Sequence, residues 1–143
     1  MPAGDCVFCA IVAGTAPAHI VLDEPDVLAF LDQRPVFKGH TLVVPRAHIV
    51  TLPEVPRELL TTLFVAVQRC AAAVTDPAGI AADGSFVAEN NVVSQAVPHL
   101  HVHVVPRRRK DGLRGFFRPR QKYESEEEMA AYAALIQAAL TTR

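Results

Sequence analysis

The chain of 143 residues has three cysteines, no run of 18 apolar residues and almost no net charge, with a formal value of −1 at pH 7. Three cysteines are too few, and odd in number, for a disulfide-stabilised scaffold. The lack of a long apolar run argues against a transmembrane helix. The near-neutral balance argues against general attraction to nucleic acid or to an anionic membrane, although a local basic patch remains possible.

The segment Met1–Asp5 lacks the basic and apolar regions of a signal peptide, so we expect a cytoplasmic protein. No repeat, low-complexity tract or linker interrupts the sequence, and half of its residues are hydrophobic. This length and composition predict a single domain over residues 1–143. Within it, 107–143 would form a basic loop and a C-terminal helix.

Sequence periodicity predicts two main helices and about five strands. A helical spacing of apolar residues marks 56–74 and a segment that starts near Ser125, with a shorter helix over 6–13. Strand patterns occur at 20–23, 27–32, 41–45, 85–89 and 99–105. Strands joined mostly by hairpins, with the helices kept apart from them, favour an α+β fold with an antiparallel sheet.

Both main helices carry an apolar side that we expect to be buried. In 56–74 this stripe consists of Leu60, Leu63, Phe64, Val67, Cys70, Ala71 and Val74, so Cys70 is interpreted as a core residue. Ser125 and Glu128 fit a capping box at the start of the last helix. The buried side of that helix would be Met129, Tyr132, Ala133, Ile136 and Leu140.

Three of the six histidines fall within five residues, at 99, 101 and 103. Side chains alternate along a strand, so these imidazoles would share one face while Leu100, Val102 and Val104 enter the core. Imidazole can act as nucleophile, as general acid or base and as metal ligand. Two alternatives are a face that merely tolerates histidine and a single metal held by all three rings. Rings spaced by about 7 Å along a strand would strain the tetrahedral geometry of such a metal site.

The segment 94–107 resembles the signature of the histidine-triad (HIT) family of nucleotide hydrolases and transferases. The segments 28–32 and 39–48 resemble its nucleotide-binding strand and its second histidine segment. The resemblance covers residues 5–107. It implies a HIT-like fold whose sheet extends across a homodimer.

The resemblance implies a role for each catalytic histidine. His101 would be the nucleophile that attacks the α-phosphorus and forms a nucleotidyl-histidine intermediate, which water then hydrolyses. His103 would lie beside the phosphate and help to bind it. His40 would sit behind His101 and support its ring through a hydrogen-bond relay with a backbone carbonyl.

The resemblance also implies the substrate contacts. Asp32 would hold the two ribose hydroxyls, for which a carboxylate acceptor is suited. Phe8, Phe30 and Leu31 would line the base pocket, and Gln95 and Asn90 would contact the phosphate side. Without the resemblance, Asp32 reads as a turn residue and the two phenylalanines as ordinary core.

Cys6 and Cys9 form a Cys-x-x-Cys pair, which on residues alone could be a buried pair, a redox pair or half of a metal site. A tetrahedral zinc needs two further ligands, and His48 and His99 are available. The sequence resembles prokaryotic family members in which such a set binds zinc. This resemblance implies a structural zinc held by Cys6, Cys9, His48 and His99.

Residues 107–122 contain eight of the fourteen lysines and arginines, including Arg118 and Arg120. They form either a cationic rim for a polyphosphate, nucleotide or partner, or a solvated loop balanced by nearby glutamates. Leu113, Phe116 and Phe117 suggest that the loop docks on something. By resemblance, this segment lies near the partner subunit's active site.

The chain departs from the family pattern just before the triad. The segment 89–96 lacks glycine, and Ala96 has no hydroxyl where relatives carry a residue thought to protonate a leaving amine. This weakens the case for a phosphoramidase of lysyl adducts. We expect a hydrolase or nucleotidyl transferase that acts on purine nucleotide adducts or dinucleoside polyphosphates and releases a nucleoside monophosphate. The alternative is a non-catalytic nucleotide-binding adaptor on the same fold.

Overall fold

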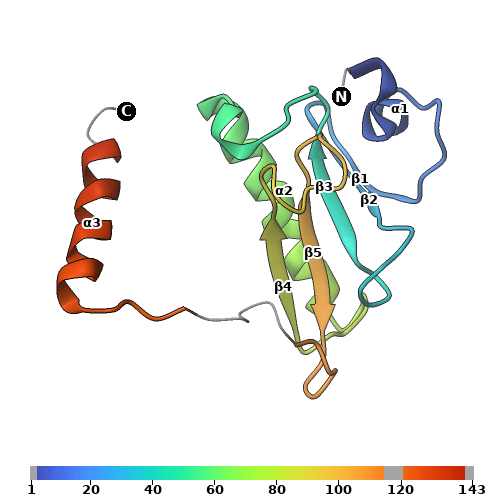
Figure 1. Cartoon of the computed structure of the whole chain (residues 1–143). Coiled ribbons are helices and arrows are strands. Elements are labelled where there is room, and N and C mark those ends of the chain that lie inside the picture. The colour runs from blue at the N-terminus through green and yellow to red at the C-terminus, as the bar shows by residue number, and fades with distance from the viewer. Residues whose placement is uncertain (1–2, 115–120, 141–143) are drawn as a thin grey trace. The chain divides into compact units, whose positions relative to one another are not determined.

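The computed structural model describes residues 3–114 and 121–140, in two units that are treated separately below (Figure 1). The first unit, which ends at Asp111, contains the sheet with helices α1 (Val7–Val12) and α2 (Arg57–Thr75). Two short 3-10 helices, η1 (Ala3–Asp5) and η2 (Leu52–Glu54), also lie in it. The second unit, from Gly112, contains helix α3 (Glu126–Leu140).

The first unit is built on a five-stranded sheet in the order β1-β2-β3-β5-β4, and every neighbouring pair is antiparallel. The predicted α+β fold with an antiparallel sheet is therefore confirmed. The backbone N–H of Glu24 donates to the carbonyl of Val27 at 3.0 Å and closes the turn between β1 and β2. The strands are β1 (Ile20–Asp23), β2 (Val27–Leu31), β3 (Thr41–Pro45), β4 (Gly84–Glu89) and β5 (Val102–Arg107).

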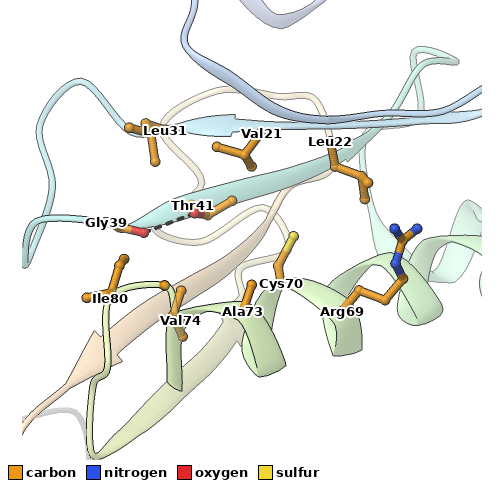
Figure 2. Close-up of a pocket in the computed structure, with 11 residues that line it drawn as sticks. Val21, Leu22, Leu31, Gly39, Thr41, Arg69, Cys70, Ala73, Val74 and Ile80 are labelled. Atoms are coloured by element: carbon orange, nitrogen blue, oxygen red, sulfur yellow. Dashed lines mark hydrogen bonds between the residues drawn. The ribbon is translucent and has the colours of Figure 1, made fainter. Parts of the chain in front are cut away.

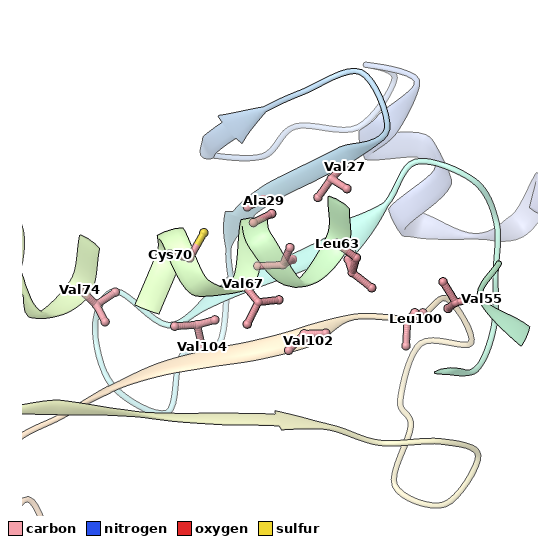
Figure 3. Packing of buried hydrophobic residues seen from close by; sticks show 12 residues of the cluster. Val27, Ala29, Val55, Leu63, Val67, Cys70, Val74, Leu100, Val102 and Val104 are labelled. Atoms are coloured by element: carbon pink, nitrogen blue, oxygen red, sulfur yellow. The ribbon is translucent and has the colours of Figure 1, made fainter. Parts of the chain in front are cut away.

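The alternation of side chains gives the sheet two apolar faces. On one face the strands pack against α2 through Val27, Ala29, Val43, Val102, Val104, Leu63, Val67, Cys70 and Val74 (Figure 3). On the other face they pack against α1 through Leu28, Phe30, Leu42, Val44, Cys6, Phe8 and Ile11. Leu42 of β3 pairs with His103 of β5, so the histidines belong to the α1 face.

Helix α2 confirms the predicted helix to within one residue at each end, and Cys70 lies in the core with 8% of its surface exposed. Phe64 is the exception in the predicted stripe. It is 41% exposed, because it falls at the solvent edge of the buried arc. Among the described residues, α2 alone is long and apolar enough to cross a membrane by length and composition, but its apolar side packs on the sheet here.

Strand β5 begins at Val102 and not at His99, so the predicted strand over 99–105 starts too early. The segment before it is bent: the N–H of His99 donates to the carbonyl of Val97 at 2.8 Å, and the N–H of Leu100 donates to Ile49 at 2.7 Å. Pro98, which has no N–H to offer a sheet ladder, precedes this bend. His99 is therefore free to point away from the other two histidines.

Only one of the two hydrogen bonds of the predicted capping box forms at the start of helix α3. The hydroxyl of Ser125 accepts from the N–H of Glu128 at 3.1 Å, whereas the carboxylate of Glu128 accepts from Glu124 at 2.9 Å and not from Ser125. The predicted buried side is wrong for this unit. Met129, Tyr132, Ala133, Ile136 and Leu140 are all exposed, because the described residues of this unit contain no second helix or strand on which α3 could bury its apolar face.

Leu63 is fully buried between α2 and the sheet, so Leu63→Ala should remove apolar contacts and leave a cavity. We expect a loss of about 2–5 kcal/mol in the free energy of unfolding, measured by urea denaturation. Val65→Ala, on the exposed side of the same helix, is the matched control and should change stability by less than about 0.5 kcal/mol. Equal effects of the two substitutions would contradict the assignment of the core.

Candidate functional site

His101 is buried, with 7% of its surface exposed, and its ring is held by the backbone of the triad itself. Its Nδ1 lies 2.8 Å from the carbonyl oxygen of His99. A carbonyl can only accept a hydrogen bond, so Nδ1 carries the proton and Nε2 keeps its lone pair. This is the tautomer required of an imidazole that attacks an electrophile through Nε2.

His40 fixes the tautomer of His103. Gly39, in the left-handed region at φ +97°, turns the chain just before it. The backbone N–H of Val36 donates to Nδ1 of His40 at 3.1 Å, so the proton of neutral His40 lies on Nε2. That Nε2–H faces Nδ1 of His103 at 2.9 Å. His103 therefore accepts at Nδ1 and carries its own proton on Nε2.

This arrangement differs from the relay expected for His40. The carbonyl that supports His101 belongs to His99, and the hydrogen bond of His40 goes to His103. The rings of His101 and His103 lie side by side, with centroids 4.9 Å apart. A nitrogen lone pair thus lies next to an N–H donor. Such a pair can attack an electrophilic centre and stabilise the negative charge that develops there.

Burial favours the neutral forms of His40 and His103. Burial first, and then the neighbouring His101 and His40, lower the pKa of His103 to about 4 against the opposing effect of Asp32. Burial also lowers the pKa of His40, against the opposing effect of Asp32. Neutral rings are what the donor–acceptor chain from Val36 to His103 requires.

Asp32 lies at the edge of the histidine cluster. Its Oδ1 accepts from the N–H of Arg34 at 2.8 Å, which is the turn contact expected of an aspartate after a strand. Its Oδ2 lies 3.8 Å from Nδ1 of His40, beyond hydrogen-bonding distance. The side chain is 24% exposed, so a carboxylate oxygen is accessible to a ligand beside the histidines.

Phe8 and Phe30 form an aromatic wall next to His101. Their ring centroids are 5.4 Å apart in an edge-to-face arrangement, and Phe8 meets the ring of His101 edge to face at 5.1 Å. Both residues are also core residues of the α1 face. The structure therefore places Phe8 against His101 with Phe30 behind it and buries both phenylalanines, and their contact with a base stays a prediction.

Leu31, expected in the base pocket, lies elsewhere. It follows Phe30 on β2, and the alternation of the strand turns it to the α2 face. There it lines an apolar cavity of about 340 Å³ between the first three strands and the C-terminal half of α2 (Figure 2). Other lining residues include Val21, Cys70, Val74 and Ile80.

The amide of Gln95 closes the loop before the triad. It donates to the carbonyl of Val50 at 2.7 Å and accepts from the N–H of Val92 at 3.0 Å. Val92 (φ 70°) and Ser94 (φ 63°) both adopt the left-handed conformation that favours glycine. The loop therefore keeps a glycine-like backbone although it contains no glycine, at a cost in strain.

The neighbouring amide that anchors this loop is Asn91 and not Asn90. Its Oδ1 accepts from the N–H of Leu52 at 2.8 Å. Asn90 is partly buried in the same loop. Contacts of Gln95 and Asn90 with a phosphate stay a prediction, and for Gln95 they would require the amide to exchange its present partners.

Cys6, Cys9, His48 and His99 form a cluster whose ligand atoms all lie within 4.8 Å of one another. The Sγ–Nδ1 distances are 3.5 Å for Cys6–His99, 3.2 Å for Cys9–His48 and 3.5 Å for Cys9–His99. Tetrahedral zinc with these ligands separates neighbouring donor atoms by about 3.3–3.8 Å. The side chains present therefore fit a tetrahedral zinc.

The protonation states also suit a metal. Nε2 of His99 faces the carbonyl of Pro45 at 2.8 Å and so carries the proton, which leaves the Nδ1 lone pair towards the thiols. Burial and the adjacent Cys6 raise the pKa of Cys9 to about 11, so without a cation Cys9 stays a thiol near neutral pH. The triad rings do not converge on one point, which disfavours a single metal bound by all three.

Part of the basic loop serves the fold. Arg107 donates to both carboxylate oxygens of Asp111 at 2.6 and 2.8 Å. Arg108 donates to the carbonyls of Ile80 and Ala81, each at 3.0 Å. Arg118, Arg120, Phe116 and Phe117 lie outside the described residues, so the docking role of the loop stays a prediction.

Three backbone groups of the site could not be found in the sequence. The N–H of Val36 and the carbonyls of Pro45 and His99 each fix one histidine tautomer. Every residue except proline has an N–H and every residue has a carbonyl, so such contacts leave no signal in residue type.

Residues 13–110 match the HIT domain family. The uncharacterized HIT-like protein Rv1262c of Mycobacterium tuberculosis is 44% identical over 110 residues, which cover 76% of this chain and 75% of that protein. Some more distant relatives carry enzyme names. The adenosine 5'-monophosphoramidase HNT1 of Saccharomyces cerevisiae is 33% identical over 76% of this chain and 66% of its own length, and the adenylylsulfatase HINT3 of Arabidopsis thaliana is 30% identical over 76% and 55%.

Solved structures agree. SMU.412c from Streptococcus mutans superposes with a TM-score of 0.85 at 36% identity, covering 95% of this chain and 85% of that one. A zinc-bound histidine triad family protein from Mycobacterium smegmatis superposes with a TM-score of 0.73 at 40% identity, covering 96% and 99%.

The lowered pKa of His103 has a consequence for acid stability. The unfolded chain takes up this proton near the ordinary histidine pKa of about 6.5, whereas the folded chain resists it down to about 4. Stability is therefore lost as the pH falls through this window. The free energy of unfolding should therefore fall between pH 7 and pH 5, and His103→Gln should make this fall smaller by about 1 kcal/mol, after allowance for partial exposure. Urea denaturation at the two pH values measures the difference.

The matched control is His19→Gln, which replaces an exposed histidine and should leave the pH dependence of the parent chain in place. If His103→Gln and His19→Gln gave the same dependence, the assignment of a buried neutral His103 would be wrong.

Proposed function

This chain belongs to the HIT family, and we propose that it is a nucleotide-binding hydrolase that attacks the α-phosphorus of a nucleotide adduct or dinucleoside polyphosphate and releases a nucleoside monophosphate. One observation carries the proposal. His101 is fixed with a free Nε2 lone pair, and the neighbouring His103 is fixed as an N–H donor.

In the first step, the Nε2 lone pair of His101 forms a bond to the α-phosphorus, and the bond from phosphorus to the leaving group breaks. The imidazole becomes cationic because its Nδ1 keeps the proton. The carbonyl of His99, which accepts that proton's hydrogen bond, stabilises the charge. The Nε2–H of His103 would donate to a non-bridging oxygen of the phosphorus centre.

In the second step, water attacks the same phosphorus, and the bond to Nε2 of His101 breaks with its electron pair. The nucleoside monophosphate leaves, and His101 regains its lone pair. One proton of the attacking water passes to the solvent. Two displacements, each with a lower barrier, thus replace one direct attack by water.

The nucleoside would bind between Phe8, Phe30 and Asp32. The aromatic wall suits a planar base, and the accessible carboxylate suits the two ribose hydroxyls. The names of two relatives, an adenosine 5'-monophosphoramidase and an adenylylsulfatase, support an adenylyl substrate. We therefore propose a purine nucleotide, with adenine preferred.

Ala96 favours leaving groups that need no proton. A phosphate, sulfate or carboxylate departs as an anion, whereas an amine must be protonated as it leaves. Ala96 offers no hydroxyl for that transfer. We thus favour phosphoanhydrides and other substrates with acidic leaving groups over lysyl phosphoramidates.

We further propose that Cys6, Cys9, His48 and His99 hold a structural zinc, in line with the zinc-bound M. smegmatis relative. When bound, the ion would stabilise the thiolates and cross-link α1 to the residues that follow β3 and precede β5. We also infer a cytoplasmic homodimer. The edge strand β4 would extend the sheet, and the exposed apolar side of α3 would gain a surface to pack on.

Substitution of the nucleophile separates the enzyme from an adaptor. His101→Asn should lower kcat by about 10⁴-fold, because no other group forms the phosphorus–nitrogen bond, while nucleotide affinity stays near that of the parent. The measurement is a hydrolysis screen over diadenosine polyphosphates, adenosine phosphoramidates and acyl-adenylates, with mass spectrometry of acid-sensitive adducts on His101. Unchanged turnover in this variant, or a parent chain that binds nucleotides without turnover or adduct, would refute the proposal and favour the adaptor.

Metal removal tests the structural role of the zinc. The purified chain should contain one zinc per molecule by elemental analysis. Removal with a chelator should lower the free energy of unfolding by about 3 kcal/mol or more while kcat at saturating substrate stays within about twofold. Cys9→Ser should lose the zinc, and Cys70→Ala, which removes the thiol outside the cluster, should keep it. An immediate and reversible loss of kcat on chelation would instead indicate a metal-activated water.

A further inference from the structure

Phe8 is shared by the metal cluster and the nucleotide site. It lies in sequence between Cys6 and Cys9, and its ring meets three neighbours edge to face. The centroid distances are 5.9 Å to His99, 5.1 Å to His101 and 5.4 Å to Phe30. One side chain thus touches a metal ligand, the nucleophile and the aromatic wall expected to hold the base.

The position of Phe8 depends on contacts outside its own helix. Helix α1 has six residues, too few to be stable alone in water. Its buried side chains Phe8 and Ile11, together with the N-cap residue Cys6, pack on the sheet. Its two thiols reach His99 and His48, 93 and 39 residues away along the chain. A metal would turn these weak sulfur contacts into strong bonds, so its release would loosen α1 together with Phe8.

The nucleophile, in contrast, is held by bonds that involve no metal. His101 is fixed by the carbonyl of His99, whose own ring donates to the carbonyl of Pro45. The backbone N–H of Leu100, between His99 and His101, donates to the carbonyl of Ile49 at 2.7 Å. Metal release should therefore disturb the wall for the base more than the orientation of His101, and lower affinity more than kcat.

We propose that metal binding at Cys6, Cys9, His48 and His99 and nucleotide binding beside His101 are positively coupled, with Phe8 as the element shared by both sites. This inference rests on the proposed function, since it needs a nucleotide to bind against Phe8 and Phe30. Coupling between two ligands is reciprocal. The metal must strengthen nucleotide binding by the same factor as the nucleotide strengthens metal binding.

The experiment measures both sides of this cycle with zinc and adenosine 5'-monophosphate (AMP). Calorimetry gives the Kd of AMP for the zinc-loaded and the zinc-stripped protein. Competition with a chromogenic chelator gives the zinc affinity with and without saturating AMP. We expect AMP to bind about 5- to 100-fold more weakly without zinc, and to tighten zinc binding by the same factor.

Two variants locate the coupling. The coupling factor is the Kd of AMP without zinc divided by the Kd of AMP with zinc. Phe8→Ala, loaded with zinc, should keep one zinc per chain, while its coupling factor falls towards one. Val7→Ala changes a half-exposed residue of the same Cys-x-x-Cys segment and should keep the parent's factor. Equal AMP affinity with and without zinc would overturn the coupling, and an undiminished factor in Phe8→Ala would overturn the role of Phe8.

Far-UV circular dichroism checks that the stripped protein stays folded. If it unfolds, the rate at which a chelator removes zinc from the loaded, folded protein replaces the equilibrium measurement. AMP should then slow zinc release from the parent and from Val7→Ala but not from Phe8→Ala, and equal slowing in all three would overturn the proposal. A loaded protein that binds no AMP at all would mark failure of the proposed function, which differs from equal binding in both forms.

Discussion

His99 makes three contacts on which both sites depend. Its Nδ1 faces the thiols of Cys6 and Cys9, its Nε2 donates to the carbonyl of Pro45, and its own carbonyl holds Nδ1 of His101. The first two contacts determine which nitrogen is available to a metal. The third leaves the Nε2 lone pair of His101 free. A residue with 0% exposure thus connects a structural cluster to a chemical one.

The two faces of the sheet carry different groups of residues. The α2 face holds the larger apolar cluster, with the cavity that Leu31 lines. The α1 face holds the histidines, the cysteine pair and the aromatic wall. Because strand side chains alternate with a period of two, Phe30 and Leu31 differ by one position and still belong to different environments. The strands β3 and β5 that carry the histidine site are supported on their opposite face by the packing of α2.

Much of the fold could be predicted from patterns with a clear period. The strands at 41–45 and the helix that contains Leu63 follow the alternation and the 3.6-residue repeat. Two features overrode those patterns. The bend at Pro98–His99 shortened the last strand, and the apolar side of α3 stays exposed because α3 is the only helix or strand among the described residues of its unit. Local spacing encodes which face of an element is apolar but not what will cover it.

The site residues were recognisable because of their side chains, whereas the groups that set their protonation were not. The N–H of Val36 and the carbonyls of Pro45 and His99 belong to the backbone. A substitution that keeps the local backbone path cannot delete these donors and acceptors, unless proline replaces Val36. The tautomers of His101, His99 and His40 therefore depend little on which side chains surround them. Contacts made by side chains such as Phe8 are lost on substitution, so under the proposed function changes at Phe8 or Ala96 would alter the preferred substrate while the histidine tautomers stay the same.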